Sequence, residues 1–202
     1  MTTDAKVNSR EAKRLATRER LFTAAVAELR RSGVAAADVS AIVSAAGVAH
    51  GTFFFHFPTK EHAVAELGQR EEARLAGELD RFLATPRDLR STLEESVRLA
   101  AALERRLGTA LFRDMVRLYF TPSRPELSLW PEHPLISRVV VEFERARDRG
   151  EIPDDPAVDP GTTAVFFFMG FFALLVTYER TAERNRMLEQ YMTVLLRGLG
   201  NR

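Results

Sequence analysis

Residues 38–61 read DVSAIVSAAGVAHGTFFFHFPTKE, and this stretch decides the fold of the amino-terminal part of the chain. Asp38 is a residue type that caps helix N-termini, so we expect a short helix to begin there. Gly47 interrupts the helical pattern and is able to take the positive φ that a tight turn requires. A second short helix then runs to about Phe57 and ends before Pro58. The stretch therefore predicts two short helices joined by a tight turn.

Two short helices joined through a glycine are typical of a helix-turn-helix motif. Such a motif needs apolar residues on both helices to fix their crossing, and these are Val39, Ile42, Val48 and Phe53. The outer face of the second helix would then be presented to the major groove of DNA. Pairs of helices around a glycine also occur as plain packing, so the pattern alone leaves both a DNA reader and a purely structural pair open.

Apolar residues recur at helical spacing along the rest of the chain, and no series of strands can be recognised. We expect the first helix over residues 9–32, with Ser9 as its cap and Gly33 as its end. Residues 121–134 hold four of the nine prolines and are expected to form a loop. The remaining helices are expected from about residue 59, around residues 89–103 and 111–118, from residue 136 to Gly150, and over residues 159–181 and 184–199. The predicted fold class is all-α, with about nine helices.

Composition and charge narrow the class of protein further. The chain has 202 residues, 46% of them hydrophobic, which is enough for one domain or two small ones with a real core. Cysteine is absent, which excludes disulfides, thiolate metal sites and a cysteine nucleophile. Nine basic and six acidic residues give residues 1–61 a net charge of +3, whereas residues 62–202 carry −2. This asymmetry favours a polyanionic partner at one end, and the charged first twenty residues predict a cytoplasmic protein without a signal peptide.

The residues around the motif resemble those of a known family. Residues 17–22 read TRERLF, Ala24, Ala25 and Ile42 follow, and AAGVAHGTFFFHFPTKE completes the pattern. Together they closely resemble the TetR (tetracycline repressor) family of bacterial regulators over about residues 15–65. The resemblance implies a homodimeric repressor with a DNA-binding helix-turn-helix domain at residues 1–58. It also implies that residues 59–202 form a helical domain that binds a small inducer and dimerises through its last two helices.

The resemblance also implies which residues contact operator DNA. His50, Gly51 and Thr52 match the start of the recognition helix, and Phe54 stands where many members have a tyrosine that reaches a phosphate. His56 and Lys60 match a histidine near the DNA backbone and a phosphate-contacting lysine. The complete set of expected DNA-binding residues is Arg18, Ser40, Ser44, His50, Gly51, Thr52, Phe54, His56 and Lys60.

Two features depart from the family pattern. Phe54 has no hydroxyl to donate, and no lysine or arginine occurs between Arg31 and Lys60. Because DNA affinity comes largely from cations that neutralise phosphates, we expect an arm at the start of the first helix to supply them. Its basic residues are Lys6, Arg10, Lys13, Arg14 and Arg18. The alternative is a small-molecule-binding helical dimer whose DNA reader has decayed.

The carboxy-terminal part is rich in phenylalanine and contains one uncharged stretch. Residues 161–178 carry no charge and reach the lower limit of a membrane span, but a helix buried partly against a second subunit explains them better. We therefore expect no membrane partner. Nine of the 14 phenylalanines lie in two clusters, at 53–57 and 166–172. They are either core or part of an apolar ligand pocket, for which the candidates are Phe112, Met115, Phe143, Phe167 and Phe171.

No catalytic or metal-binding pattern is present in the sequence. It lacks a P-loop, a G-x-G-x-x-G motif and a nucleophile elbow. His50, His56 and His62 recur every six residues, a spacing that does not place them on one helix face, and Pro58 interrupts the helix between them. We therefore expect no enzyme activity, cofactor or metal. The sequence predicts a transcriptional regulator, most simply a repressor released from operator DNA by a small, largely apolar molecule.

Overall fold

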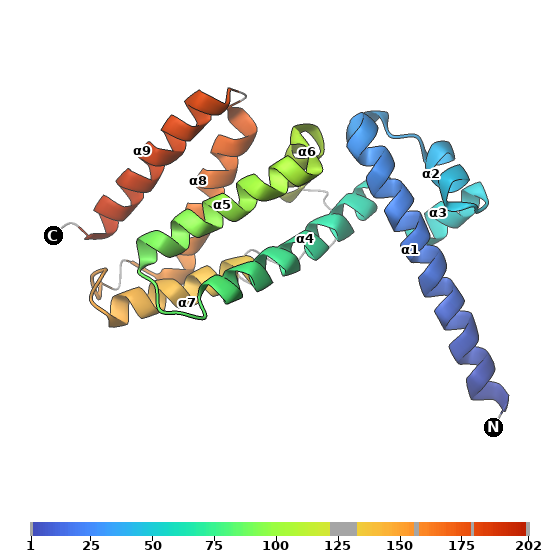
Figure 1. The fold of residues 1–202 in the computed structure, drawn as a ribbon, viewed down its shortest axis with the longest axis horizontal. Helices are drawn as coiled ribbons and strands as arrows, with labels where there is room; N and C mark the ends of the chain where they lie inside the picture. The colour runs from blue at the N-terminus through green and yellow to red at the C-terminus, as the bar shows by residue number, and fades with distance from the viewer. Residues whose placement is uncertain (1, 122–132, 156–157, 179, 201–202) are drawn as a thin grey trace. The chain divides into compact units, whose positions relative to one another are not determined.

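The computed structural model describes residues 2–121, 133–155, 158–178 and 180–200, and these are helical with no strand among them (Figure 1). The all-α prediction is therefore confirmed. Most of the predicted proline-rich loop, residues 122–132, lies outside the described residues. The helices are α1 (Thr2–Ala36), α2 (Val39–Ala46), α3 (His50–His56), α4 (Lys60–Phe82), α5 (Leu89–Leu107), α6 (Thr109–Tyr119), α7 (Pro134–Asp148), α8 (Pro160–Thr177) and α9 (Thr181–Gly200).

The first helix begins earlier than the sequence indicates. It starts at Thr2 rather than residue 9, so the expectation that Ser9 caps it is wrong. Residues 2–14 contain neither glycine nor proline, and Arg14 bonds Glu11 one turn away at 2.6 Å, so nothing in this segment stops the helix. At the other end, Gly33 takes non-helical angles (φ 74°, ψ 168°) and kinks the chain before its last turn.

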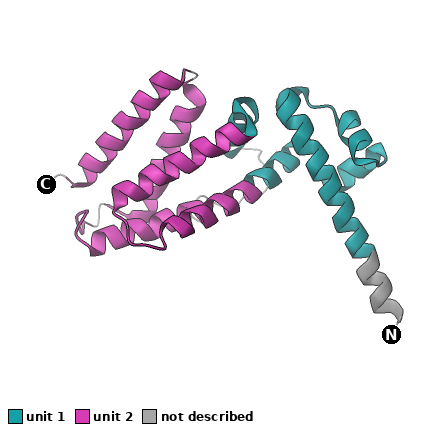
Figure 2. Ribbon diagram, viewed as in Figure 1, with its two compact units in different colours: residues 1–68, 107–125 teal, residues 69–106, 126–202 magenta. Residues whose placement is uncertain are grey.

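The chain folds into two compact units (Figure 2). Unit 1 comprises residues 1–68 and 107–125, and unit 2 comprises residues 69–106 and 126–202. Unit 1 therefore holds α1, α2 and α3 together with the first turns of α4 and the whole of α6. The predicted functional boundary at residues 58 and 59 stays a prediction, because the compact units are divided at other positions.

The core of unit 1 holds the two helices of the motif against α1. Leu21, Leu29 and Phe57 are completely buried, and Ile42 is 1% exposed. The rings of Phe53 and Phe57 lie 5.7 Å apart, and Phe22 packs against Phe57 at 6.4 Å. Each such side chain contributes roughly 1.5–3 kcal/mol by burial. The aromatic residues of α3 that point inward therefore fix this short helix to the rest of the unit.

Unit 2 is built around α8, which packs against α7 and α9 (Figure 1). Phe143, Phe167 and Phe171 are fully buried in this unit. The carboxylate of Asp159 accepts the backbone N–H of Thr162 at 2.6 Å and so caps α8. By length and apolar composition α8 alone among the described helices matches a membrane span, and 39% of it is buried inside the protein.

Candidate nucleic-acid interface

The turn between α2 and α3 has the geometry that the sequence predicts. Asp38 takes extended angles and accepts the N–H of Ser40 at 2.8 Å, which caps α2. Gly47 is left-handed (φ 65°, ψ 44°), and its N–H bonds the carbonyl of Ser44 while Val48 N–H bonds that of Val43 at 3.0 Å. The two helices are bent by 97° relative to each other. This angle lies within the range of a helix-turn-helix motif.

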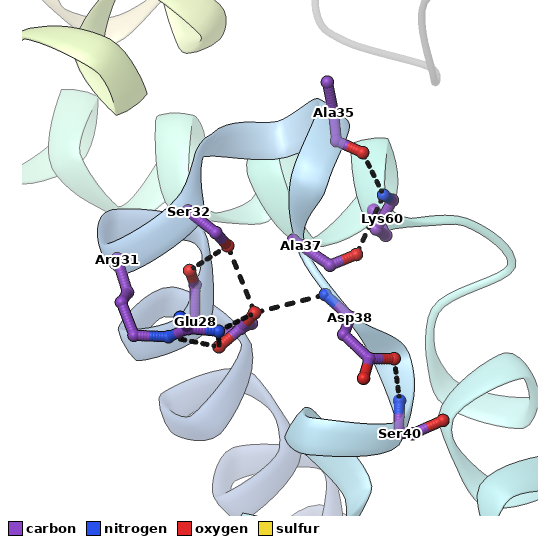
Figure 3. Close-up of polar contacts among 8 residues, drawn as sticks. All are labelled: Glu28, Arg31, Ser32, Ala35, Ala37, Asp38, Ser40 and Lys60. Atoms are coloured by element: carbon purple, nitrogen blue, oxygen red, sulfur yellow. Dashed lines mark hydrogen bonds and ion pairs between the residues drawn. The ribbon is translucent and has the colours of Figure 1, made fainter.

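A polar cluster fixes the junction between α1 and α2 (Figure 3). The carboxylate of Glu28, which is 7% exposed, accepts bonds from the Arg31 guanidinium, the Ser32 hydroxyl and the backbone N–H of Asp38. These bonds, led by those from Arg31, lower the pKa of Glu28 below its ordinary value. A charged Glu28 therefore holds the residue that caps α2 in place.

Lys60 joins the start of α4 to the same junction (Figure 3). Its Nζ donates to the carbonyl oxygens of Ala35 at 3.2 Å and Ala37 at 3.0 Å. These carbonyls follow the kink in α1 and have no partner in a regular helical turn. The lysine that the family pattern assigns to a DNA phosphate thus also anchors α4 to the end of α1.

Arg18 is half-buried and His56 is buried, and both have contacts within unit 1. The Arg18 guanidinium donates to the carbonyl oxygen of His56, bonds the carboxylate of Glu66, and lies 4.4 Å from the centre of the Phe57 ring. His56 is 7% exposed, and its burial, together with the charges of Arg18 and Arg14, lowers the pKa of its imidazole. These contacts fix the carboxyl end of α3 to α1 and α4.

The outward face of α3 carries the other expected contact residues. His50, Gly51 and Phe54 are exposed, Thr52 is half-buried, and Ser40 and Ser44 are exposed on α2. Phe54 is 46% exposed and Phe55, which the sequence analysis did not single out, is 74% exposed. Helical spacing contains the missed signal, since residues 50, 51, 54 and 55 share the face opposite to the buried Phe53 and His56.

The candidate ligand residues fall into both compact units. Phe112 and Met115 belong to α6 of unit 1, whereas Phe143, Phe167 and Phe171 belong to unit 2. All five are at most 5% exposed. The rings of Phe167 and Phe171 stack at 6.0 Å, and Phe167 also stacks on Tyr191 at 6.4 Å. The structure therefore places these residues in packed cores and does not gather them around one described cavity.

A cavity of about 280 Å³ lies within unit 1, between α6 and the end of α1. Val34, Glu61, Asp114 and Arg117 are among its lining residues. The carboxylate of Asp114 accepts the N–H of Val34 at 3.1 Å, directly after the kink at Gly33. Helix α6 is thus bonded to the segment that leads into the helix-turn-helix motif.

Comparison with known proteins supports the resemblance found in the sequence. Residues 21–67 match the model of the bacterial regulatory proteins, tetR family. These residues include α2 and α3, together with Lys60 and its two bonding partners Ala35 and Ala37. No curated protein matches the sequence significantly. The amino-terminal segment is therefore similar to the helix-turn-helix region of the tetR family.

The solved structures that resemble the chain extend this likeness to its full length. FadR from Thermus thermophilus, a TetR family transcriptional repressor in complex with lauroyl-CoA, has a TM-score of 0.72 at 23% identity, over 92% of this chain and 96% of that one. GusR from Salmonella enterica has a TM-score of 0.66 at 25% identity, over 92% and 96%. RolR in complex with resorcinol has a TM-score of 0.65 at 17% identity, over 94% and 90%. The chain therefore shares the fold of these proteins over more than nine tenths of its length.

Proposed function

We propose that this chain is a ligand-responsive repressor that binds operator DNA as a homodimer in the cytoplasm. The observation that carries the proposal is the near-perpendicular pair of α2, capped by Asp38, and α3, whose outward face is exposed within a segment that matches the tetR family. A recognition helix held in this way is able to enter a major groove. The face that would meet DNA includes the candidate residues His50, Gly51, Thr52 and Phe54.

The remaining candidate DNA-binding residues differ in their exposure and in the contacts that they make within the protein. Ser40 and Ser44 are exposed on α2, and we assign them contacts with the DNA backbone. Arg18 and His56 hold α3 in place through their bonds inside the unit. Lys60 has both roles in this proposal, because its ammonium has three N–H groups and two of them bond Ala35 and Ala37. The third is available for a phosphate.

The dimer of this proposal forms through α8 and α9. Three large apolar side chains on these helices are exposed in the single chain: Phe166 at 63%, Met169 at 38% and Val194 at 71%. Packing against the same face of a second copy would bury them, and a twofold interface of this kind uses one surface twice. The same packing explains an uncharged α8 without a membrane, so we assign the chain no membrane partner.

The proposed inducer is a small, largely apolar molecule. Structural neighbours were solved with lauroyl-CoA and with resorcinol, and both ligands have apolar surface. The candidates for its contacts are Phe112 and Met115 on α6 of unit 1 and, as a separate group, Phe143, Phe167 and Phe171 of unit 2. Because α6 bonds the end of α1 through Asp114 and Val34, a ligand that moves α6 would shift the start of the reader. Ligand and operator then weaken each other's binding by linkage.

Selection from a random library of double-stranded DNA tests this function. The full-length protein should enrich a sequence with two half-sites whose centres are about 10 base pairs apart, or a multiple of that distance. Thr52→Ala should relax the enriched sequence while the variant stays folded. The absence of lysine and arginine from residues 32–59 favours the alternative, a ligand-binding dimer with a decayed reader. That alternative predicts no enrichment above the input library.

A further inference from the structure

The outward face of α3 is unusually apolar. Phe54 and Phe55 are 46% and 74% exposed, although phenylalanine is among the residue types most often fully buried. The ring of Phe54 lies 5.5 Å from that of His50 and meets Phe53 edge-on at 5.4 Å. Phe55 meets the ring of His56 edge-on at 5.1 Å. The two neighbouring rings restrict Phe54, which limits the entropy that a contact by this side chain would cost.

The chemistry of this face restricts what it is able to recognise. Helices α2 and α3 contain no arginine, lysine, asparagine or glutamine, the residues that form paired hydrogen bonds with guanine or adenine. Most major-groove base edges present donors and acceptors, and a phenyl ring placed against them would leave these groups without partners. The 5-methyl group of thymine is the apolar feature of that groove. Two phenyl rings on a recognition helix are complementary to it.

We propose that Phe54 and Phe55 read thymine through its 5-methyl group, so that the operator half-site requires thymine where it faces them. The inference rests on the proposed DNA-binding function and deepens it by naming how bases are selected. Phe55, the more exposed of the two, provides most of this selection. Phe54 is less exposed and lies near the rings of His50 and Phe53.

Replacing thymine by deoxyuridine tests the proposal, because this change removes only the methyl group. The probe is the duplex that the full-length protein enriches from a random library, synthesised with one thymine at a time replaced by deoxyuridine. We expect affinity to fall about fourfold for each methyl group that meets a phenyl ring. With Phe55→Ala, the difference between the thymine and deoxyuridine duplexes should disappear at one position of each half-site.

Two further variants serve as controls for this test. Phe55→Leu retains an apolar side chain and should keep part of the thymine preference, which shows that folding is not the cause of the loss. Val141→Ala truncates a side chain that is 41% exposed on α7 in unit 2, and it should leave the preference unchanged. Circular dichroism and sedimentation of the three variants without DNA should match those of the native protein.

Each contrary outcome has a distinct meaning. Failure to enrich any sequence overturns the proposed function together with this inference. Enrichment of a duplex whose affinity is unchanged by deoxyuridine at every position overturns the inference and leaves DNA binding intact. A Phe55→Ala variant that loses the same affinity for both duplexes contradicts methyl recognition and indicates ring stacking instead. A change of oligomeric state in that variant makes the face an interface between copies, which also overturns the inference.

Discussion

At the carboxyl end of α3, the imidazole of His56 shows how burial controls the chemistry of a single residue. Its side chain is 7% exposed, its backbone carbonyl accepts the Arg18 guanidinium, and burial is the main cause of its lowered pKa. The charges of Arg18 and Arg14 add to the same effect. The neutral form is therefore the one that the folded reader accommodates. A positive charge here would oppose the packing that holds α3.

We expect the stability of the protein to fall when the pH drops below about 6.5. In that range His56 is protonated in the unfolded chain but stays neutral in the folded protein. The free energy of unfolding therefore decreases as the pH falls from about 6.5 through the lowered pKa of His56 in the folded state. His56→Gln should remove this contribution. The measurement is the difference in Tm between pH 7.5 and 5.5, which should be smaller for the variant because the other histidines titrate in both proteins. An equal difference in the two proteins would contradict the assignment.

At the scale of the helix, Asp38 is the N-cap that determines where α2 begins. Its carboxylate accepts the N–H of Ser40 at 2.8 Å. Asp38→Ala removes this cap and should reduce the free energy of unfolding by about 1 kcal/mol, whereas Asp38→Asn should cost only a few tenths, since asparagine caps equally well. Chemical denaturation of both variants checks the pair. If asparagine costs as much as alanine, the charge rather than the cap is responsible.

The close approach of α8 and α9 depends on Gly170. A Cβ atom at this position would lie 2.7 Å from the ring of Tyr191, whose hydroxyl donates to the carbonyl oxygens of Phe166 and Phe167, both at 2.9 Å. Burial raises the pKa of Tyr191 to about 12. Since an unfolded tyrosine has a pKa near 10, this residue's stabilising contribution is lost as the pH rises from about 10 through 12.

We expect Gly170→Ala to destabilise the protein by about 1–3 kcal/mol, because the ring must move out of a packed interface. Displacing the ring should also lower the pKa of Tyr191 toward 10, which ultraviolet titration of tyrosinate would detect. Gly77→Ala is the matched control: Gly77 lies inside α4 with open space at its Cβ, so alanine should stabilise by up to about 1 kcal/mol. Destabilisation by both variants to the same extent would contradict the close-approach argument.

Local chemistry explains which elements the sequence could predict. Asp38, Gly47 and the break at Gly150 were recognisable because a cap or a positive φ is a property of a few adjacent residues. The start of α1 could not be recognised, because residues 2–14 lack glycine and proline and so carry no local signal that ends a helix. The bonds of Lys60 to Ala35 and Ala37 join positions more than twenty residues apart, so no spacing rule reveals them.

The same distinction applies to the candidate site. The exposed positions of α3 follow from helical periodicity, and the sequence predicted most of them, although it passed over Phe55. The internal roles of Arg18 and His56 depend on how α1, α3 and α4 pack, which is information that only the fold supplies. The five candidate ligand residues are buried, as apolar residues generally are, so their burial does not distinguish a pocket from a core.

For the whole molecule, dimerisation through α8 and α9 is tested by two substitutions of the same kind. Phe166 is 63% exposed in the single chain, so Phe166→Glu should fold normally and weaken the dimer, because the interface would bury an unpaired carboxylate. Phe171 is completely buried, so Phe171→Glu should instead cost several kcal/mol of folding stability. Sedimentation and circular dichroism separate the two effects. A dimer of undiminished affinity in Phe166→Glu would place the interface elsewhere.

In the proposed function, the electrostatic part of DNA affinity must come from outside α2 and α3, because neither contains lysine or arginine. The basic arm before and within the start of the first helix was expected to supply it, and this segment is the first part of α1, which is helical from Thr2. Arg10, Arg14 and Arg18 recur every four residues and therefore share one face of this helix. Arg18 contacts the carboxyl end of α3, and the charge of Arg14 influences His56, so this basic face flanks the recognition helix.

We therefore expect a chain that begins at residue 15 to bind all DNA sequences more weakly while keeping its base preference. Each lost phosphate contact should reduce the slope of log affinity against log salt by about 0.9, so the slope should fall by roughly 1–3. The measurement is binding to the selected duplex and to a scrambled one across a salt series. Arg10→Gln with Lys13→Gln should produce part of the effect in a chain whose helix is intact, which separates charge from helix length.

Thr52→Ala should instead relax base preference and leave the slope unchanged, because a base contact releases no counterion. A truncated chain with the full slope would show that the phosphates are neutralised elsewhere, and Lys60, which has one N–H group beyond its two carbonyl bonds, would then be the next residue to replace.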